Sequence, residues 1–292
     1  MYGTFILFKR VTMKWAYFND GFIPEEACQL PAGDLAVQRG YGIFDFFKTL
    51  AGSPVFLEDH LSRFYQSAET MRLPVGKTAM ALKEIIRNLI DKNGLADSGI
   101  RLTLTGGVSP DGYSLATPNL IITQQPLKRP AANAFETGLR LVTYAHQRQL
   151  PHVKTIDYLM PIWLQPWLAE MKGDDVLYHH NNNISECPRA NFFIVTSDGR
   201  IATPAQHILK GIHRAKVLQL AGKKAVERVI TLAEVTTAQE AFITSTTKQV
   251  LPVTAIDGRA IGDGTPGPVT RLLAEQLETL IQKSITLVQP AS

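Results

Sequence analysis

The chain has 292 residues, of which 45% are hydrophobic and 19% are charged, and its formal net charge is +4. This length allows two modest domains, each with its own buried core. No apolar run approaches the roughly 20 residues needed to cross a bilayer, and residues 1–10 do not resemble a secretory signal. Two cysteines make no disulfide framework, as expected of a cytoplasmic protein. Because the basic residues are scattered, we expect neither a nucleic-acid partner nor a membrane partner.

The first half of the chain is predicted to form strands covered by helices. Residues before Met13 are predicted to be an extension, because residues 13–17 begin a strand-like segment that could itself start a protein. Apolar residues spaced by three and four predict a helix over 57–73 and a second one over 82–90, which ends before Gly94. The clearest strands are predicted at residues 100–105 and 120–123.

A domain boundary is predicted over residues 123–138, where prolines and polar residues interrupt the apolar pattern. We therefore expect a small N-terminal domain over 1–122 and a larger C-terminal domain over 139–292.

The second half again mixes strands and helices. Strands are predicted at 176–178 and 191–196, and the latter enters a turn at Asp198-Gly199, with a similar turn at Asp257-Gly258. Pro268 is placed to begin a helix with a buried apolar stripe. Because neither half alternates strand and helix strictly, the fold class is predicted to be α+β rather than a doubly wound sheet.

A lysine and a glutamate in the second half are candidates for catalysis. Lys154 lies among mostly apolar or aromatic neighbours, and a desolvated lysine loses its proton more readily and can attack an aldehyde to form a Schiff base. Glu186 precedes the strand predicted at 191–196, and a carboxylate there could hold a proton on the ring nitrogen of a cofactor. Each residue alone is more often a surface charge, but the pair is more specific than either.

Three segments could bind a phosphate group. Arg63 lies on the first predicted helix, Gly211-Ile212-His213 precedes a helical run over 214–221, and Ser245-Thr246-Thr247 follows a strand predicted at 241–244. A guanidinium, the free N–H groups of a helix start and a run of hydroxyls together make a site for a dianion. Each segment by itself also fits an ordinary surface residue, turn or helix cap.

Two other patterns are weak evidence for a binding site. His179-His180 suggests a metal, but adjacent strand residues point to opposite faces and no Cys/His cluster supplies further ligands, so no metal is expected. The glycines at Gly40-Tyr41-Gly42 and Gly106-Gly107 lack the strand–loop–helix spacing of a dinucleotide site.

The order of these pieces over residues 17–281 resembles the class IV aminotransferases, the fold-type IV pyridoxal phosphate enzymes that include D-amino acid transaminases. The resemblance is carried by seven segments: residues 39–45, His60-Leu61-Ser62-Arg63-Phe64 with Ser67-Ala68, Lys154 with Tyr158-Leu159, Ile184-Ser185-Glu186 with Asn191-Phe192-Phe193, residues 211–214, Ser245-Thr246-Thr247 with Pro252-Val253, and residues 267–270. It implies two domains, of which the C-terminal one binds the cofactor.

The resemblance also implies roles for individual residues. Lys154 would carry pyridoxal 5'-phosphate as an imine, Glu186 would meet the pyridine nitrogen, and Tyr158 would lie near the cofactor oxygen. The phosphate would be held by a further set: Arg63, Ile212, His213, Ser245, Thr246 and Thr247, with Leu209 against the ring. The family further implies a homodimer whose active sites lie between the two domains and are completed by a loop from the partner.

This sequence departs from the family pattern at several positions. His213 stands where a threonine is usual, and Asp45 stands where a glutamate is common. The Arg-x-His pair that binds the substrate carboxylate in D-amino acid transaminases is replaced by residues 110–113, Pro-Asp-Gly-Tyr. The Tyr-Ile-Arg-Pro stretch of L-branched-chain transaminases is also absent, because residues 99–102 read Gly-Ile-Arg-Leu.

The sequence therefore favours a transaminase that moves an amino group between a D-amino acid and a 2-keto acid by a ping-pong mechanism. An arginine suits the substrate carboxylate because it binds through two parallel hydrogen bonds, and Arg39, Arg101 and Arg189 are the candidates. The alternatives are an L-branched-chain transaminase, an aminodeoxychorismate lyase, which residues 106–114 faintly favour, and a catalytically silent binding protein on the same fold. The presence of both Lys154 and Glu186 argues against a catalytically silent protein.

Overall fold

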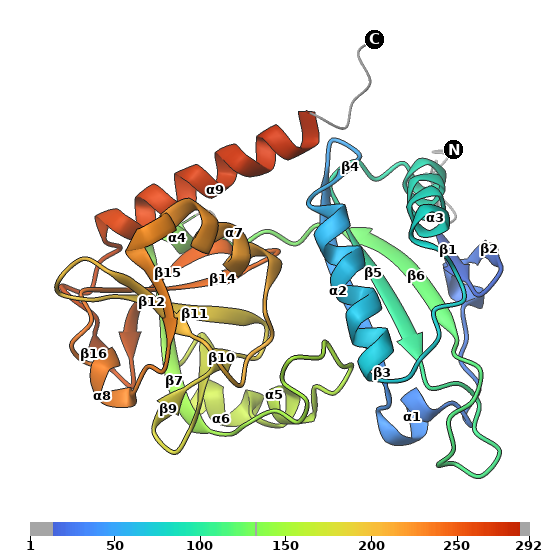
Figure 1. Ribbon diagram of the computed structural model, residues 1–292, viewed down its shortest axis with the longest axis horizontal. Helices are drawn as coiled ribbons and strands as arrows, with labels where there is room; N and C mark the ends of the chain where they lie inside the picture. The colour runs from blue at the N-terminus through green and yellow to red at the C-terminus, as the bar shows by residue number, and fades with distance from the viewer. Residues whose placement is uncertain (1–13, 132, 287–292) are drawn as a thin grey trace, which may run out of the picture.

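The computed structural model describes residues 14–131 and 133–286, which form two β-sheets, each with its own helices (Figure 1). The predicted N-terminal extension lies outside the described residues. Within the described ranges, no helix has the length and apolar character needed to span a membrane. The mixture of helix and strand in both halves confirms the predicted α+β class.

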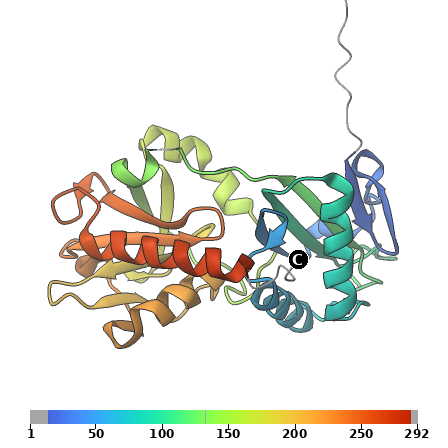
Figure 2. The ribbon, with the colours of Figure 1, turned by 90° about the horizontal axis from the view of Figure 1, so that it is seen from above.

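The first sheet is antiparallel and has the strand order β2-β1-β6-β5-β3-β4. Its strands are β1 (Trp15–Phe18), β2 (Gly21–Pro24), β3 (Gly42–Leu50), β4 (Ser53–Pro54), β5 (Ser98–Thr105) and β6 (Leu120–Pro126). Helices α2 (Leu57–Thr70) and α3 (Ala79–Asn93) lie together on one side of it (Figure 2), while η1 (Glu25–Ala27) and α1 (Leu35–Arg39) are short connections.

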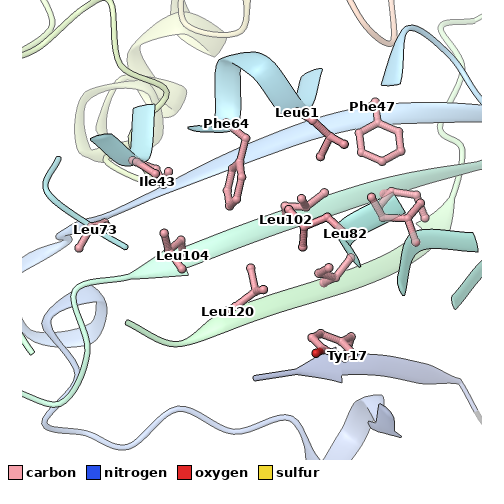
Figure 3. Close-up of a cluster of buried hydrophobic side chains, with 14 of the residues drawn as sticks. Tyr17, Ile43, Phe47, Leu61, Phe64, Leu73, Leu82, Leu102, Leu104 and Leu120 are labelled. Carbon is pink, nitrogen blue, oxygen red and sulfur yellow. The ribbon is translucent and has the colours of Figure 1, made fainter. Parts of the chain in front are cut away.

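A hydrophobic core lies between these two helices and the sheet (Figure 3). Leu61 and Phe64 of α2 are buried against Phe47 of β3 and Leu102 of β5. Helix α2 presents its apolar residues at spacings of three and four, so one face is buried and the other faces solvent. This packing fixes the position of α2, from which Arg63 projects.

The second sheet is mixed, with the order β13-β12-β11-β14-β15-β7-β8-β9, while β10 pairs with β11 and β16 with β15. Its strands are β7 (Leu139–Ala145), β8 (Asp175–His180), β9 (Asn183–Ile184), β10 (Glu186–Cys187), β11 (Ala190–Val195), β12 (Ile201–Pro204), β13 (Ala225–Arg228), β14 (Glu240–Ser245), β15 (Gln249–Ile256) and β16 (Arg259–Ala260). Its helical segments are α4 (Ala134–Thr137), α5 (Leu159–Trp163), α6 (Gln165–Glu170), α7 (Ile212–Ala221), η2 (Gly222–Lys224), α8 (Leu232–Val235) and α9 (Pro268–Thr286). Helices α7 and α9 pack on β14 and β15.

Most elements expected from the sequence are present, with shifted ends. Helix α2 stops at Thr70 rather than residue 73, because Arg72 has a left-handed backbone with φ of 57°. Helix α3 ends where Gly94 adopts the left-handed conformation, as predicted. Helix α7 begins at Ile212, two residues before the expected start, so His213 lies in its first turn.

The boundary over residues 123–138 stays a proposal. Strand β6 ends inside it at Pro126, and α4 lies near its other end. The two sheets are thus joined by a short segment after β6.

Candidate active site

The segment that carries Lys154 joins β7 to α5 and lies against β3 of the other sheet. The Phe44 N–H donates to the Lys154 carbonyl at 2.9 Å, and the Ile156 N–H donates to the Gly42 carbonyl at 3.1 Å. These bonds form a single antiparallel bridge between Ile43 and Thr155. A Cβ at Gly42 would lie 2.9 Å from the Leu104 carbonyl oxygen of the neighbouring strand β5 and 3.1 Å from Ile156 Cδ1, so a larger residue would crowd this junction. Lys154 is therefore placed where the two sheets meet.

The Lys154 amine lies in surroundings that disfavour its charge. Its Nζ is 4.4 Å from the centre of the Phe44 ring, a contact that by itself favours the ammonium form, but burial outweighs it. Burial, and then the positive charge of Arg63, lower the pKa of Lys154 from 10.5 to about 7. The neutral amine is therefore well populated near neutral pH, as a nucleophile or a proton acceptor requires.

The Glu186 carboxylate is buried and fully bonded. Arg148 Nη1 donates to Oε1 at 2.8 Å, and Oε2 accepts from the Leu209 N–H at 3.0 Å and from Asn191 Nδ2 at 3.2 Å. Burial raises the pKa of Glu186 to about 7, and the charge of Arg148 opposes that shift. The carboxylate is thus fixed in orientation and can share a proton near neutral pH.

Arg148 is a site residue that the sequence analysis missed. Besides Glu186, it donates to the carbonyls of Pro151 at 3.2 Å and Val153 at 3.0 Å, so it ties the glutamate to the segment that carries Lys154. A buried glutamate requires a positive partner. The chain offers many arginines, however, and no motif identifies this one.

Arg63 faces the same pocket and is held by Asp45. Its Nε and Nη2 donate to the two carboxylate oxygens of Asp45, both at 2.8 Å, and His60 Nδ1 lies 2.7 Å from Asp45 Oδ1. Although burial works against it, the charges of Arg63 and His60 keep the pKa of Asp45 well below its usual value. Asp45 thus holds the Arg63 guanidinium in one orientation at the pocket.

The start of α7 contributes backbone N–H groups to the same pocket. Gly211 precedes the helix, and a side chain there would come within 2.2 Å of Asn191 Oδ1. Ile212 and His213 form the first turn, where N–H groups have no partner inside the helix. The same tight packing therefore places both the α7 N-terminus and the asparagine that contacts Glu186.

These groups surround one pocket of roughly 530 Å³, part of which is open to solvent. The sequence-predicted residues that line it are Arg63, Lys154, Tyr158, Glu186, Arg189, Leu209, Ile212, His213, Ser245 and Thr246. Thr247 follows them in the chain but is not among the lining residues. The structure thus brings nearly all the predicted residues together from both halves.

The donor set of the pocket fits an aromatic phosphate ester. The Thr244 hydroxyl and both ring nitrogens of His213 are buried, and none has a hydrogen-bond partner among the described residues. With Arg63 and the α7 N-terminus they can bind an anionic oxygen group. Glu186 lies ready for a basic ring nitrogen and Lys154 for an aldehyde carbon. Among the described residues, no group of His, Cys, Asp or Glu could hold a metal ion.

The three candidate substrate arginines lie in different places. The Arg101 guanidinium is 4.2 Å from the centre of the same Phe44 ring that faces Lys154, and Arg189 lines the pocket. Neither makes an ion pair with another described residue. Arg39 instead donates to the Gln38 carbonyl on an exposed helix and does not line the pocket. Arg101 and Arg189 are the two candidates that the structure places near Lys154.

We predict that the Lys154 amine reacts with aldehydes with an apparent pKa of about 7. An amine is nucleophilic above its pKa, so the rate of capture of pyridoxal 5'-phosphate by cofactor-free protein should rise through pH 7 rather than near pH 10. Borohydride reduction and peptide mapping should place the cofactor on Lys154, and Lys154→Ala should retain no covalent cofactor. Attachment to another lysine would contradict this.

Comparison with known proteins agrees with this geometry. Residues 42–256 match the family model described as amino-transferase class IV. A D-alanine aminotransferase of Bacillus licheniformis is 28% identical over 276 residues, which cover 92% of this chain and 96% of the relative. Branched-chain-amino-acid aminotransferase-like protein 1 of Arabidopsis thaliana is 32% identical over 92% of this chain but only 51% of its own length.

The fold has a close match among solved structures. The branched-chain amino acid aminotransferase of Escherichia coli superposes with a TM-score of 0.85. The match covers 92% of this chain and 95% of the other, at 25% sequence identity. A second branched-chain amino acid aminotransferase, solved with pyridoxamine 5'-phosphate, gives the same TM-score at 24% identity. At such identities the likeness concerns the fold.

Proposed function

Because the chain belongs to the class IV aminotransferases, we propose that it moves amino groups between D-amino acids and 2-keto acids. Its cofactor, as in the rest of the family, is pyridoxal phosphate. The observation that carries the proposal is the meeting of Lys154 and Glu186 with a phosphate-binding helix start in one pocket. The preference for D-amino acids is supported by several relatives named D-alanine aminotransferase.

Each residue of the pocket has a distinct task in this proposal. When bound, the cofactor supplies an aldehyde carbon and a ring that accepts electron density. Lys154 Nζ would be the nucleophile toward that carbon and, once a substrate amine has replaced it, would carry the proton from the substrate Cα to the carbon that was the aldehyde. Glu186 holds a proton on the ring nitrogen. The phosphate would be bound by a larger set that lines the pocket: Arg63, the N–H groups of Ile212 and His213, and the hydroxyls of Ser245 and Thr246.

The substrate carboxylate is assigned to Arg101 or Arg189. A guanidinium that lacks an ion-pair partner can bind a carboxylate through two hydrogen bonds without breaking an existing pair. Such binding fixes which face of Cα is turned to Lys154, and thereby selects one hand of the amino acid. Water then releases the keto acid, and a second keto acid reverses the sequence.

The single-turnover reaction with D- and L-amino acids tests the substrate. We expect D-alanine and D-glutamate to convert the bound cofactor to its aminated form faster than L-leucine and L-glutamate, as followed by absorbance. Arg101→Ala or Arg189→Ala should weaken D-substrate affinity. Arg39→Ala is the matched control, because Arg39 donates to the Gln38 carbonyl and does not line the pocket. Faster reaction with the L pair would favour the branched-chain alternative, and release of pyruvate without a keto acid would favour the lyase.

Glu186→Gln tests the role of the carboxylate. A glutamine keeps the shape of the side chain but cannot stabilise a proton on the ring nitrogen. We therefore expect cofactor binding to persist, while the barrier rises by about 3 kcal/mol and turnover falls roughly a hundredfold. Cofactor content by absorbance and the rate of Cα proton exchange by NMR measure the two effects separately. Exchange at the parent rate would rule out this role.

We also infer a homodimer, because an apolar surface lies beside the pocket. Leu159, Ile162 and Trp163 of α5 are 72%, 62% and 63% exposed, and α5 directly follows Tyr158. Large apolar side chains gathered on one short helix favour an interface.

Sedimentation equilibrium tests this assembly. The parent should be a dimer at micromolar concentration, and Trp163→Glu should shift it toward monomer because a charge would be buried in the interface. Met80→Glu is a matched control, since Met80 is 66% exposed on α3, away from the pocket. A parent protein that sediments as a monomer would contradict the inference.

A further inference from the structure

His213 is buried in the wall of the pocket without a partner for either ring nitrogen. Its side chain is 2% exposed, and both Nδ1 and Nε2 lack a hydrogen bond to any described residue. The edge of its ring packs on Phe56, with the ring centres 5.7 Å apart. It lines the same pocket as Arg63, Ser245 and Thr246. Buried polar groups are normally paired, so two unpaired nitrogens on a residue that lines the pocket make His213 a candidate partner for a bound ligand.

Two of the positive side chains near this wall, Arg63 and Lys216, already form ion pairs with carboxylates. Arg63 donates to both carboxylate oxygens of Asp45, so the pair carries no net charge. Lys216, on the same helix as His213, is paired with Asp59 at 2.8 Å. A phosphate dianion that is buried here would therefore meet less positive charge than the count of basic residues suggests.

Four ionisable groups face His213 from the elements around it: His60 and Arg63 on α2, Lys48 on β3 and Lys216 on α7. Burial, and then these groups, hold the pKa of His213 well below 6.5. Burial likewise lowers the pKa of His60, against the pull of Asp45, and lowers the pKa of Lys48 to about 8. Before an anion binds, the imidazole of His213 is therefore neutral at physiological pH.

We propose that His213 takes up a proton when the cofactor phosphate binds at the start of α7, and that the resulting imidazolium balances the phosphate charge. A dianion beside the ring reverses the electrostatic balance, because it attracts the proton that the neighbouring cations repel. A threonine at this position could offer a hydroxyl but no charge. The inference depends on the cofactor alone, so it holds for either hand of substrate.

The sign of the pH dependence follows from linkage. The pKa of His213 is low in the empty pocket and higher in the bound one, so binding is strongest below the empty-pocket value. Affinity for the phosphate ester then falls as pH rises, by up to tenfold per pH unit, and levels off above the bound-state value. A chain with a non-titrating residue at 213 lacks this component.

Calorimetric titration with 4-deoxypyridoxine 5'-phosphate measures the proton directly. This compound lacks the aldehyde, so Lys154 cannot react with it. At about pH 7.5 its phosphate, with a second pKa of about 6, is a dianion in solution. Titrations in two buffers of different ionisation enthalpy give the number of protons taken up.

We expect the parent to take up close to one proton more than His213→Thr or His213→Asn, and its affinity to fall more steeply between pH 6 and 8. Protonation of the ring nitrogen is common to all three proteins and cancels in the difference. His180→Asn, at an exposed position of β8, should match the parent. With 4-deoxypyridoxine, which has no phosphate, the difference should vanish.

Equal proton uptake by the parent and the two variants would overturn the proposal, as would a difference that persists without the phosphate. A phosphorus NMR shift of the bound ligand typical of a monoanion would place the proton on the phosphate and also overturn it. Thermal unfolding without ligand shows whether each variant is folded, and either folded variant is sufficient. None of these outcomes changes the result of the D- and L-amino acid comparison.

Discussion

The antiparallel contact between β3 and residues 154–156 is the constraint on which the site depends. It brings a lysine from the chain of the second sheet to the edge of the first, and its two backbone hydrogen bonds fix which way the side chain points. Successive residues of an extended segment face opposite sides, so a shift of one residue would turn Lys154 away from the pocket. A side chain at Gly42 would crowd the Leu104 carbonyl of β5 and the end of the Ile156 side chain, so glycine suits this junction.

The electrostatics of the pocket follow from which charged groups are paired. Asp45 is matched by Arg63 and Glu186 by Arg148, so each carboxylate is held in one orientation. Lys154 has no ion-pair partner among the described residues and lies over an aromatic ring. Burial lowers the pKa of Lys154 to about 7, so the neutral and reactive form of its nitrogen is well populated near neutral pH. Asp45 is thus a positioning group for Arg63, whereas Glu186 and the unpaired Lys154 both line the pocket.

His213 shows how one departure from a family pattern can alter the physics of a shared site. Arg63, the start of α7 and the loop of Ser245 and Thr246 line one pocket, and the residue in the first turn of α7 is ionisable where a threonine is usual. Because the positive charge of Arg63 is already balanced by Asp45, a protonated His213 imidazole would supply the positive charge that a bound phosphate requires. Binding of the cofactor then acquires a dependence on pH that the fold by itself does not impose.

The sequence by itself determined the class of fold, the four longest helices and the residues expected at the pocket, but it indicated only a minority of the strands. Helix periodicity and the glycine after α3 are local signals, and the order of motifs from Arg39 to Thr270 is read directly along the chain. Arg148 could not be found in this way, because its role depends on a carboxylate 38 positions later in the sequence. Tertiary structure also decided that Arg101 lies near Lys154 while Arg39 does not, and that His213 is buried without a partner. Each of these facts concerns distance between segments remote in sequence, and such distances are set by the packing of two sheets rather than by local propensity.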